Sequence, residues 1–223
     1  MNILVIFHKW LVLKNIFIFF QIWLILLLMS IHNTSKKIAV IGASGLVGSS
    51  IVRCALERGY EVNGTMRNID DIIKVKYLNK LVNSNKLKLF NASMANIDDF
   101  NLPLENVSAV FITCLIPTYK GIDGTPANEM DDVRGYSEII NPTVNGCLNI
   151  LKSVKLHSIK NVIICSSTSS TNPVPTVSIK NEIDHWSDEK EQCKLKKYTS
   201  ATKTVMEKAA MRYCKENNIR LSV

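Results

Sequence analysis

Three glycines early in the chain have the spacing of a phosphate-binding turn. They stand in the heptapeptide Gly42-Ala43-Ser44-Gly45-Leu46-Val47-Gly48, after an apolar run and before a segment of helical length. In such a turn the first glycine permits a tight bend, the second lets the backbone approach a pyrophosphate, and the third lets the helix pack on the strand. The phosphates would bind free N–H groups at the positive end of the helix. The heptapeptide therefore predicts a dinucleotide site; the alternative is a tight strand-to-helix turn without a ligand.

The residue after the next apolar run, residues 60–66, helps to distinguish an NAD site from an NADP site. Residues 60–66 have the pattern of a strand, and Arg67 follows where an NAD-binding protein carries a carboxylate for the ribose hydroxyls. An arginine without a neighbouring carboxylate suits a 2′-phosphate, so Arg67 predicts NADP. NAD is the alternative, if Arg67 is only a solvated charge and Asp70 or Asp71 binds the hydroxyls.

A second group of reactive residues lies in the C-terminal half. Residues 166–171 form a hydroxyl-rich run directly after the apolar residues 161–165, and ligands of open α/β sheets bind at the carboxyl ends of strands. Tyr198 and Lys203 follow on a segment of helical length, where a second catalytic element is expected. Without them, residues 166–171 would be interpreted as a serine-rich loop.

Alternating strands and helices must position these residues. Short apolar runs predict strands at 38–41, 60–66, 87–90, 109–113 and 161–165. Helical patterns lie between and after them, at 46–58, 69–85, 137–155 and 198–217. This alternation predicts an α/β protein, a doubly wound parallel sheet covered by helices on both faces. The runs are continuously apolar because such strands are buried on both sides.

Composition narrows the class of protein. The 223 residues include 27 Lys and Arg against 19 Asp and Glu, a net charge of +8, without a basic run interleaved with aromatic residues. We therefore expect no nucleic-acid partner. The cysteines are scattered without a C-x-x-C pair and the histidines are isolated, so we expect no metal site and a reducing, cytoplasmic compartment.

Residues 1–35 differ in composition from the rest of the chain. Residues 16–31 are apolar except for Gln21 and Ser30, somewhat fewer than the about 20 residues of a membrane-spanning helix. We expect a hydrophobic N-terminal helix that tethers the protein to a membrane through residues 1–31. A cleaved signal peptide and an N-terminal extension of a soluble enzyme are the alternatives, although the residues after the apolar run make a poor cleavage site.

Several segments together resemble the extended short-chain dehydrogenases/reductases, and within them the branch of dihydroflavonol reductase, cinnamoyl-CoA reductase and 3β-hydroxysteroid dehydrogenase. The resemblance covers residues 37–223 in the family's order. Its segments are the glycine turn, EVNGTMRN at 61–68, NPTVNG at 141–146, NVIICSS at 161–167, residues 186–194, and the long helix at 202–219. It implies that residues 36–223 form a Rossmann-type NAD(P)-binding domain, truncated in its sixth strand and without the family's C-terminal substrate domain.

The resemblance also implies a reaction, namely hydride transfer between the nicotinamide and a carbonyl or secondary alcohol of a small organic substrate. Tyr198 would be the general acid/base, Lys203 would lower its pKa and hold the nicotinamide ribose, and Ser167 would orient the substrate oxygen. A phenol with a pKa of about 10 serves as a base at neutral pH only beside a cation that favours its anion.

Two positions depart from the family's pattern. The family spaces tyrosine and lysine four residues apart, whereas Tyr198 and Lys203 are five apart. On a helix this changes the angle between the side chains from about 40° to about 140°. Aligning Lys203 puts Thr199 in the tyrosine's place, so either the helix entrance is distorted or the enzyme is impaired. Ser93 also stands where the family usually has an aspartate that contacts the adenine.

The sequence therefore predicts an NADP-preferring oxidoreductase that acts on a small-molecule substrate. The residues expected to hold the cofactor are Gly42, Ser44, Gly45, Leu46, Val47, Gly48 and Arg67. Those expected to carry the chemistry are Ser167, Tyr198 and Lys203. A cofactor-binding protein without turnover and a nucleotide-sugar epimerase or dehydratase are the alternatives. The resemblance further implies a homodimer that pairs through the helices at 137–155 and 198–217.

Overall fold

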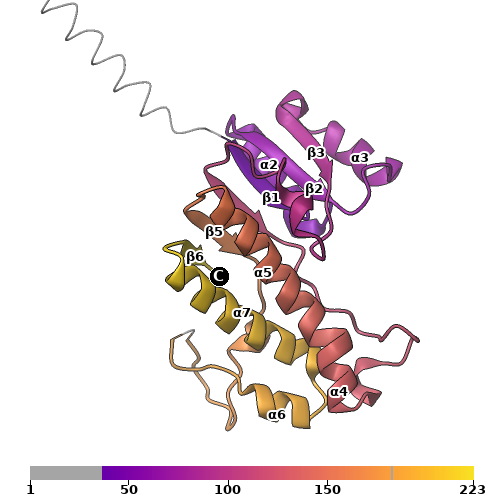
Figure 1. Ribbon diagram of the computed structural model, residues 1–223, viewed down its shortest axis with the longest axis vertical. Coiled ribbons are helices and arrows are strands. Elements are labelled where there is room, and N and C mark those ends of the chain that lie inside the picture. The colour runs from indigo at the N-terminus through magenta and orange to yellow at the C-terminus, as the bar shows by residue number, and fades with distance from the viewer. Residues whose placement is uncertain (1–36, 182) are drawn as a thin grey trace, which may run out of the picture. The chain divides into compact units, whose positions relative to one another are not determined.

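A parallel sheet of six strands forms the centre of the computed structural model, which describes residues 37–181 and 183–223 (Figure 1). The strands are β1 (Lys37–Ile41), β2 (Glu61–Met66), β3 (Leu87–Asn91), β4 (Ala109–Ile112), β5 (Asn161–Ile164) and β6 (Arg220–Ser222). Their order in the sheet is β3-β2-β1-β4-β5-β6. This order defines the Rossmann-type doubly wound fold, so the predicted fold class is confirmed.

Helices cover both faces of the sheet. The helices of the described residues are α2 (Leu46–Glu57), α3 (Ile72–Asn79), α4 (Asp132–Arg134), α5 (Asn141–Leu156), α6 (Glu189–Lys194) and α7 (Tyr198–Glu216). Of these, α4 packs chiefly against the segment Gly135–Ile140, and α6 packs chiefly against α7. Helices α5 and α7 lie side by side on one face (Figure 1), and α2 packs against β1 and β2 on the other. The element order matches the predicted alternation of strands and helices.

The continuous apolar runs are explained by burial on both faces. Within β1, Ala39 and Ile41 belong to the core under α5 and α7, while Ile38 and Val40 belong to the core under α2 and α3. All four side chains are at most 6% exposed. A strand in this position has no solvent face, and its sequence therefore shows no polar alternation.

The register of the strands brings three chain turns to one edge of the sheet. Ile41, the last residue of β1, pairs with Thr65 of β2 on one side and with Ile112 of β4 on the other. Because the strands are parallel, the loops after β1, β2 and β4 leave the sheet at the same level. The glycine turn lies in the middle of this group.

The entrance of α5 differs from the single helix predicted at 137–155. A π-helical turn, Gly135–Ile140, precedes the regular helix, and Pro142 follows at its start. Proline has no N–H to continue the helical hydrogen bonds, which accounts for irregular backbone just before it. This turn contributes Ile139 and Ile140 to a small third core that also contains Met130 and Tyr198.

The N-terminal helix and the membrane tether predicted for residues 1–31 lie outside the described residues. Within the described ranges, none of the helices combines the length and apolar character needed to cross a membrane.

Candidate functional site

A cleft of about 1040 Å³ opens at the edge of the sheet where β1, β2 and β4 end. Its walls come from the glycine turn, the loops after β2, β3 and β4, and helix α5. The lining residues are Ile41, Gly42, Ser44, Gly45, Thr65, Met66, Arg67, Ala92, Ser93, Met94, Ala95, Phe100, Thr113, Cys114, Ile116, Thr118, Pro142, Asn145, Gly146, Leu148, Asn149 and Lys152. The cleft is therefore at the carboxyl ends of the strands, where doubly wound sheets bind ligands.

The glycine turn is held in one conformation by backbone contacts. Gly42 has φ +91°, a region that favours glycine, and its N–H donates to the Thr65 carbonyl at 3.1 Å. A Cβ on Gly48 would lie 2.1 Å from the Gly42 carbonyl oxygen, so only glycine lets α2 approach the turn this closely. These two glycines perform the tasks that the spacing predicts for the first and third positions.

The N-terminus of α2 is open to an anion. Its cap residue, Gly45, offers no side-chain hydrogen bond, and the first turn contains no acidic residue. By contrast, Asp71 caps α3 and Asp188 caps α6. The first amides of a helix have no intrahelical acceptor, so those of Leu46, Val47 and Gly48 remain available beside the cleft. Helix dipole and free N–H groups together favour a pyrophosphate here.

Arg67 is the charged residue at the end of β2. It is exposed, lines the cleft, and forms no ion pair within the described part of the chain. Asp71, one of the two carboxylates considered for ribose hydroxyls, instead accepts from the Lys74 N–H at 3.2 Å and pairs with the Lys74 ammonium at 2.9 Å. Neither Asp70 nor Asp71 lines the cleft. The charge at this end is therefore positive.

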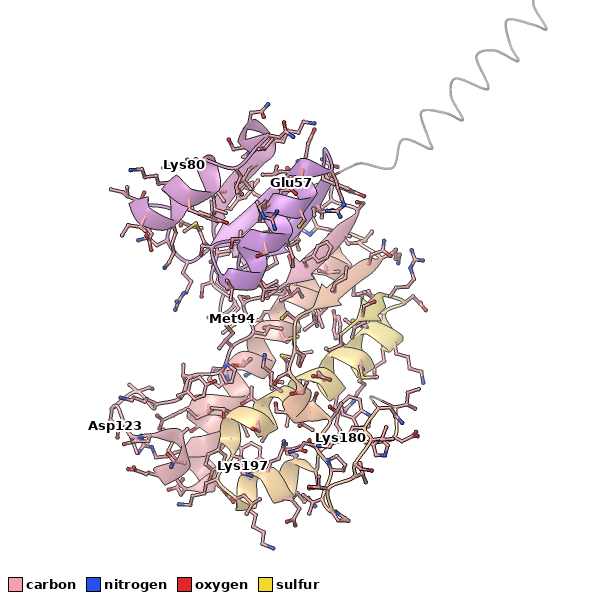
Figure 2. All side chains as sticks on the ribbon, turned by 180° about the vertical axis from the view of Figure 1, so that it is seen from behind. Glu57, Lys80, Met94, Asp123, Lys180 and Lys197 are labelled. Carbon is pink, nitrogen blue, oxygen red and sulfur yellow. The ribbon has the colours of Figure 1, made fainter. Side chains whose placement is uncertain are left out.

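The loop after β3 forms one side of the cleft. Ser93 lines it, and the nearby carboxylate of Asp99 is engaged, because it accepts from the Ser93 N–H at 2.8 Å and from Asn96 at 2.6 Å. Met94 packs on Gly146 of α5, where a Cβ would lie 2.7 Å from the methionine sulfur. Figure 2 labels Met94 between the N-terminal half of the sheet and the helices of the C-terminal half.

The end of β4 forms the opposite side. The Thr113 hydroxyl donates to the carbonyls of Ile41 at 2.9 Å and Gly42 at 3.2 Å, so it ties the glycine turn to the next strand. Cys114 follows it in the cleft wall, and burial raises the pKa of its thiol to about 11. A thiol with this pKa is protonated at neutral pH and unreactive.

Ser167 is exposed just after β5, in the loop that leads into a 3₁₀ turn (Thr168–Ser170). Its hydroxyl accepts from the Ser169 N–H at 3.2 Å and caps this turn. The neighbouring Ser166 points to the helix layer instead, and its hydroxyl donates to the buried carboxylate of Glu207 on α7. The hydroxyl-rich run thus joins the end of β5 to α7.

Lys203 lies buried under the ends of β4 and β5. Its side chain is on the inner face of α7, and its ammonium donates to the carbonyl of Leu115 in the loop after β4. Burial lowers the pKa of Lys203, and the nearby Cys165 and Glu207 partly offset this effect. Neither Lys203 nor Leu115 lines the cleft, although Cys114 and Ile116, the neighbours of Leu115 in the chain, do.

Tyr198 points elsewhere. It is 0% exposed, and its hydroxyl donates to Asp132 of α4 at 2.7 Å. Its ring lies against Gly135, where a Cβ would be 2.4 Å from the ring carbon Cε1. Burial, followed by the hydrogen bond to Asp132, raises the pKa of Tyr198 to about 12. The structure brings Ser166, Glu207 and Lys203 together but gives Tyr198 different partners.

The entrance of α7 is not distorted in a way that would reunite tyrosine and lysine. The helix runs without interruption from Tyr198 to Glu216, and the Ala201 N–H donates to the Lys197 carbonyl at 2.9 Å, as in a regular first turn. The five-residue spacing therefore separates the two side chains, as the helical geometry predicts.

Sequence reasoning did not single out three residues of this region: Thr113, Glu207 and Lys152. Thr113 is the last residue of the strand predicted at 109–113, and this position already indicated the edge of the sheet where ligands bind. Glu207 follows Lys203 by one helical turn, so the helix pattern placed both on one face. Lys152 lies on the predicted helix before β5, and its sequence context has no signal for the cleft.

Comparison with known proteins agrees with the fold and with the cleft at the glycine turn. Residues 42–213 match the family model described as NAD(P)H-binding, a match that includes the glycine turn, Arg67, Ser167, Tyr198 and Lys203. The chain belongs to this NAD(P)H-binding family. Its curated relatives confirm the resemblance to the extended short-chain dehydrogenases/reductases and to their dihydroflavonol reductase branch.

Among the family's members, the chain is 35% identical over 194 residues to dihydroflavonol 4-reductase of Callistephus chinensis, a match that covers 84% of this chain and 50% of that protein. It is 31% identical over 196 residues to anthocyanidin reductase of Arabidopsis thaliana, covering 85% and 54%. The solved structure of vestitone reductase from alfalfa (Medicago sativa) superposes with a TM-score of 0.62 at 28% identity, covering 83% and 54%. The chain thus spans about half the length of the relatives it matches.

Proposed function

We propose that the chain is the cofactor-binding part of an NADPH-dependent reductase that transfers a hydride between the nicotinamide and a carbonyl or secondary alcohol of a small organic substrate. The relatives named above are reductases, and this chain has the family's cofactor fold. The observation that carries the proposal is Arg67, a cation without an ion-pair partner among the described residues, in the wall of a cleft that begins at an uncapped helix N-terminus.

The residues divide the binding of the cofactor between them. The first amides of α2 would hold the pyrophosphate, since no side chain or acidic residue competes for them. Arg67 would bind the 2′-phosphate that distinguishes NADPH from NADH, because a guanidinium forms short, charge-assisted hydrogen bonds with phosphate. Gly42, Ser44 and Gly45 would form the floor beneath the phosphates.

The chemistry would occur near the loops after β4 and β5. The nicotinamide supplies the hydride when it is bound. Ser167 would orient the substrate oxygen with its exposed hydroxyl, and Lys203 would hold the nicotinamide ribose from below. For Tyr198 to donate a proton, its side chain would have to leave Asp132 and Gly135 and turn toward Lys203.

A second candidate function is cofactor binding without turnover. The position of Tyr198 favours it, because a buried phenol hydrogen-bonded to a carboxylate, with a pKa of about 12, is a poor general acid or base at neutral pH. Thr199, four residues before Lys203, has no acidic hydroxyl to replace it.

The first experiment is a binding titration of the full chain with NADPH and NADH. We expect tighter binding of NADPH, and an Arg67→Glu variant that loses at least about tenfold in NADPH affinity while its NADH affinity stays within about twofold. Arg212→Glu is the matched control, since Arg212 is exposed on α7 and outside the cleft. A folded chain that binds neither dinucleotide would contradict the proposal.

Consumption of NADPH then separates the two candidates. Oxidation of NADPH with a carbonyl substrate, such as a dihydroflavonol, and its loss in Tyr198→Phe would support the reductase. Binding of NADPH without consumption, unchanged in Tyr198→Phe, would support the protein without turnover.

A further inference from the structure

The charged side chains in the cleft wall are all positive. Among its lining residues the charged ones are Arg67 and Lys152, and there is no aspartate or glutamate. Lys152 is exposed, and within the described ranges it forms no ion pair. Two unpaired cations in one cleft strongly favour an anionic ligand over a neutral one.

The two cations flank the same loop, residues 92–95. On one side, the Ala92 N–H donates to the Met66 carbonyl at 3.0 Å, which holds the start of the loop next to Arg67 at the end of β2. On the other side, Asn149 of α5 donates from its side-chain amide to the Met94 carbonyl at 3.2 Å. Lys152 follows Asn149 by three residues, and such neighbours share one face of a helix.

The packing of α5 against this loop fixes where Lys152 can reach. Met94 fits against Gly146, a position that tolerates no larger residue without displacing the methionine. Asn149 adds a second contact to the loop one turn further along. Lys152 is exposed and lines the cleft on the side formed by α5 and the loop after β3.

The number of cations in the cleft bears on how many phosphate groups the ligand carries. The N-terminus of α2 already serves the pyrophosphate, so NADH would leave both Arg67 and Lys152 without an anion. NADPH carries one further phosphate, on the adenosine ribose. We propose that Lys152 binds this 2′-phosphate together with Arg67, so that the phosphate is held from β2 on one side and from α5 on the other. This inference rests on the proposed function and deepens it.

The test uses two probes that differ by this phosphate, 2′,5′-ADP and 5′-AMP, with the full chain and the variant Lys152→Met. Methionine keeps an unbranched apolar side chain, one atom shorter than that of lysine, and removes the ammonium group. We expect about fivefold weaker binding of 2′,5′-ADP, as for the loss of one solvent-exposed ion pair, and binding of 5′-AMP within about twofold. The loss should shrink at high salt, which screens an exposed charge.

Lys155→Met is the control variant. Lys155 lies on the same helix, is exposed and does not line the cleft, so its loss should change neither affinity. The double variant Arg67→Met/Lys152→Met adds a coupling measurement. If both cations hold one phosphate, the combined loss should differ from the sum of the two single losses.

Three results would overturn the inference. Equal weakening of both probes in Lys152→Met would assign Lys152 to another part of the nucleotide. If Lys152→Met weakens the binding of neither probe, Lys152 is not part of the site. The proposed function would still stand in that case if the chain prefers 2′,5′-ADP to 5′-AMP and this preference depends on Arg67. A wild-type chain that binds neither probe nor NADPH would overturn the proposed function as well.

Discussion

In both the glycine turn and the entrance of α7, a glycine allows a neighbouring group to pack unusually closely. In the turn this packing directs a helix N-terminus toward the cleft, whereas at α7 it holds Tyr198 away from Lys203. Gly48 lets α2 approach the Gly42 carbonyl, and Gly135 lets the Tyr198 ring approach the π-helical turn. A glycine with a close neighbour therefore marks tight packing, and the neighbour decides what that packing does for the site.

The largest effect should come from Gly48→Ala. The added Cβ would meet the Gly42 carbonyl oxygen at 2.1 Å, a backbone atom that cannot turn aside as a side chain can. We expect a loss of about 3 kcal/mol in the free energy of unfolding, together with loss of NADPH binding. Urea denaturation of the full chain, followed by its circular dichroism, measures the first quantity.

Gly45→Ala is the matched variant in the same turn. Its Cβ would find the nearest atom at 3.5 Å, an ordinary contact, and φ is −76°. Stability should therefore change by less than about 0.5 kcal/mol. NADPH binding should still fall sharply, because the methyl group occupies space that a pyrophosphate needs. Equal destabilisation by both alanines would contradict the division of tasks between the two glycines.

A smaller loss is expected from Gly135→Ala in the second region. The Cβ would lie 2.4 Å from the Tyr198 ring, and we expect a cost of about 2 kcal/mol as the ring or the π-helical turn shifts. Replacing the ring as well should recover part of this cost. In a double-mutant cycle with Tyr198→Leu, a coupling energy near zero would mean that the two residues do not constrain each other.

The two regions also differ in how far the sequence predicts them. The glycine turn is local: strand, glycines and helix follow one another within a short segment, so the glycine spacing together with the flanking strand and helix predicted its geometry. The strands were predictable for a similar reason, because residues 38–41 and 161–165 are apolar on both faces. The doubly wound class of the sheet was predicted from the alternation of strands and helices, whereas the order of its six strands comes from the structure.

The direction of Tyr198 depends on contacts that are distant in the sequence. Its hydroxyl donates to Asp132 and its ring contacts Gly135, two residues that precede α5 and β5 in the chain, whereas Tyr198 follows both elements. The spacing to Lys203 indicated that the two side chains diverge, but it could not reveal which partner the tyrosine finds. Lys152 was missed for the same reason, since its place in the cleft depends on how α5 packs against the loop after β3.

Tyr198→Phe sharpens the comparison with a smaller change. It removes the hydrogen bond to Asp132 and keeps the ring, so we expect a loss of about 1 kcal/mol at neutral pH. The folded pKa of Tyr198 is about 12, above the usual value of 10.0 for tyrosine. The wild type should therefore keep this contribution below about pH 10 and lose it progressively toward about pH 12. Denaturation of both proteins across this range measures the difference, which a catalytic tyrosine with a lowered pKa would not produce.

The smallest effect is expected from Lys203→Met, and its pH dependence should have the opposite sign. Burial lowers the pKa of Lys203, so the folded state binds its proton less tightly than the unfolded state does. As the pH rises toward the usual value of 10.5 for lysine, the wild type should therefore gain stability relative to the variant. At neutral pH the variant loses one hydrogen bond to the Leu115 carbonyl but no longer buries an ammonium, so the net change should stay below about 1 kcal/mol.

The two pH profiles together test whether tyrosine and lysine act as a pair. If Tyr198 and Lys203 are independent, as their separate partners indicate, the double variant Tyr198→Phe/Lys203→Met should show the sum of the single effects at every pH. If the tyrosine visits the lysine in a populated state, the ammonium would favour the phenolate, and removing the lysine would raise the alkaline midpoint of the tyrosine. Spectroscopic titration of the tyrosines in wild type and Lys203→Met, with Tyr198→Phe to assign the signal, distinguishes these outcomes. A shifted midpoint would mean that the contact with Gly135 is released often enough for the two residues to act as a catalytic pair.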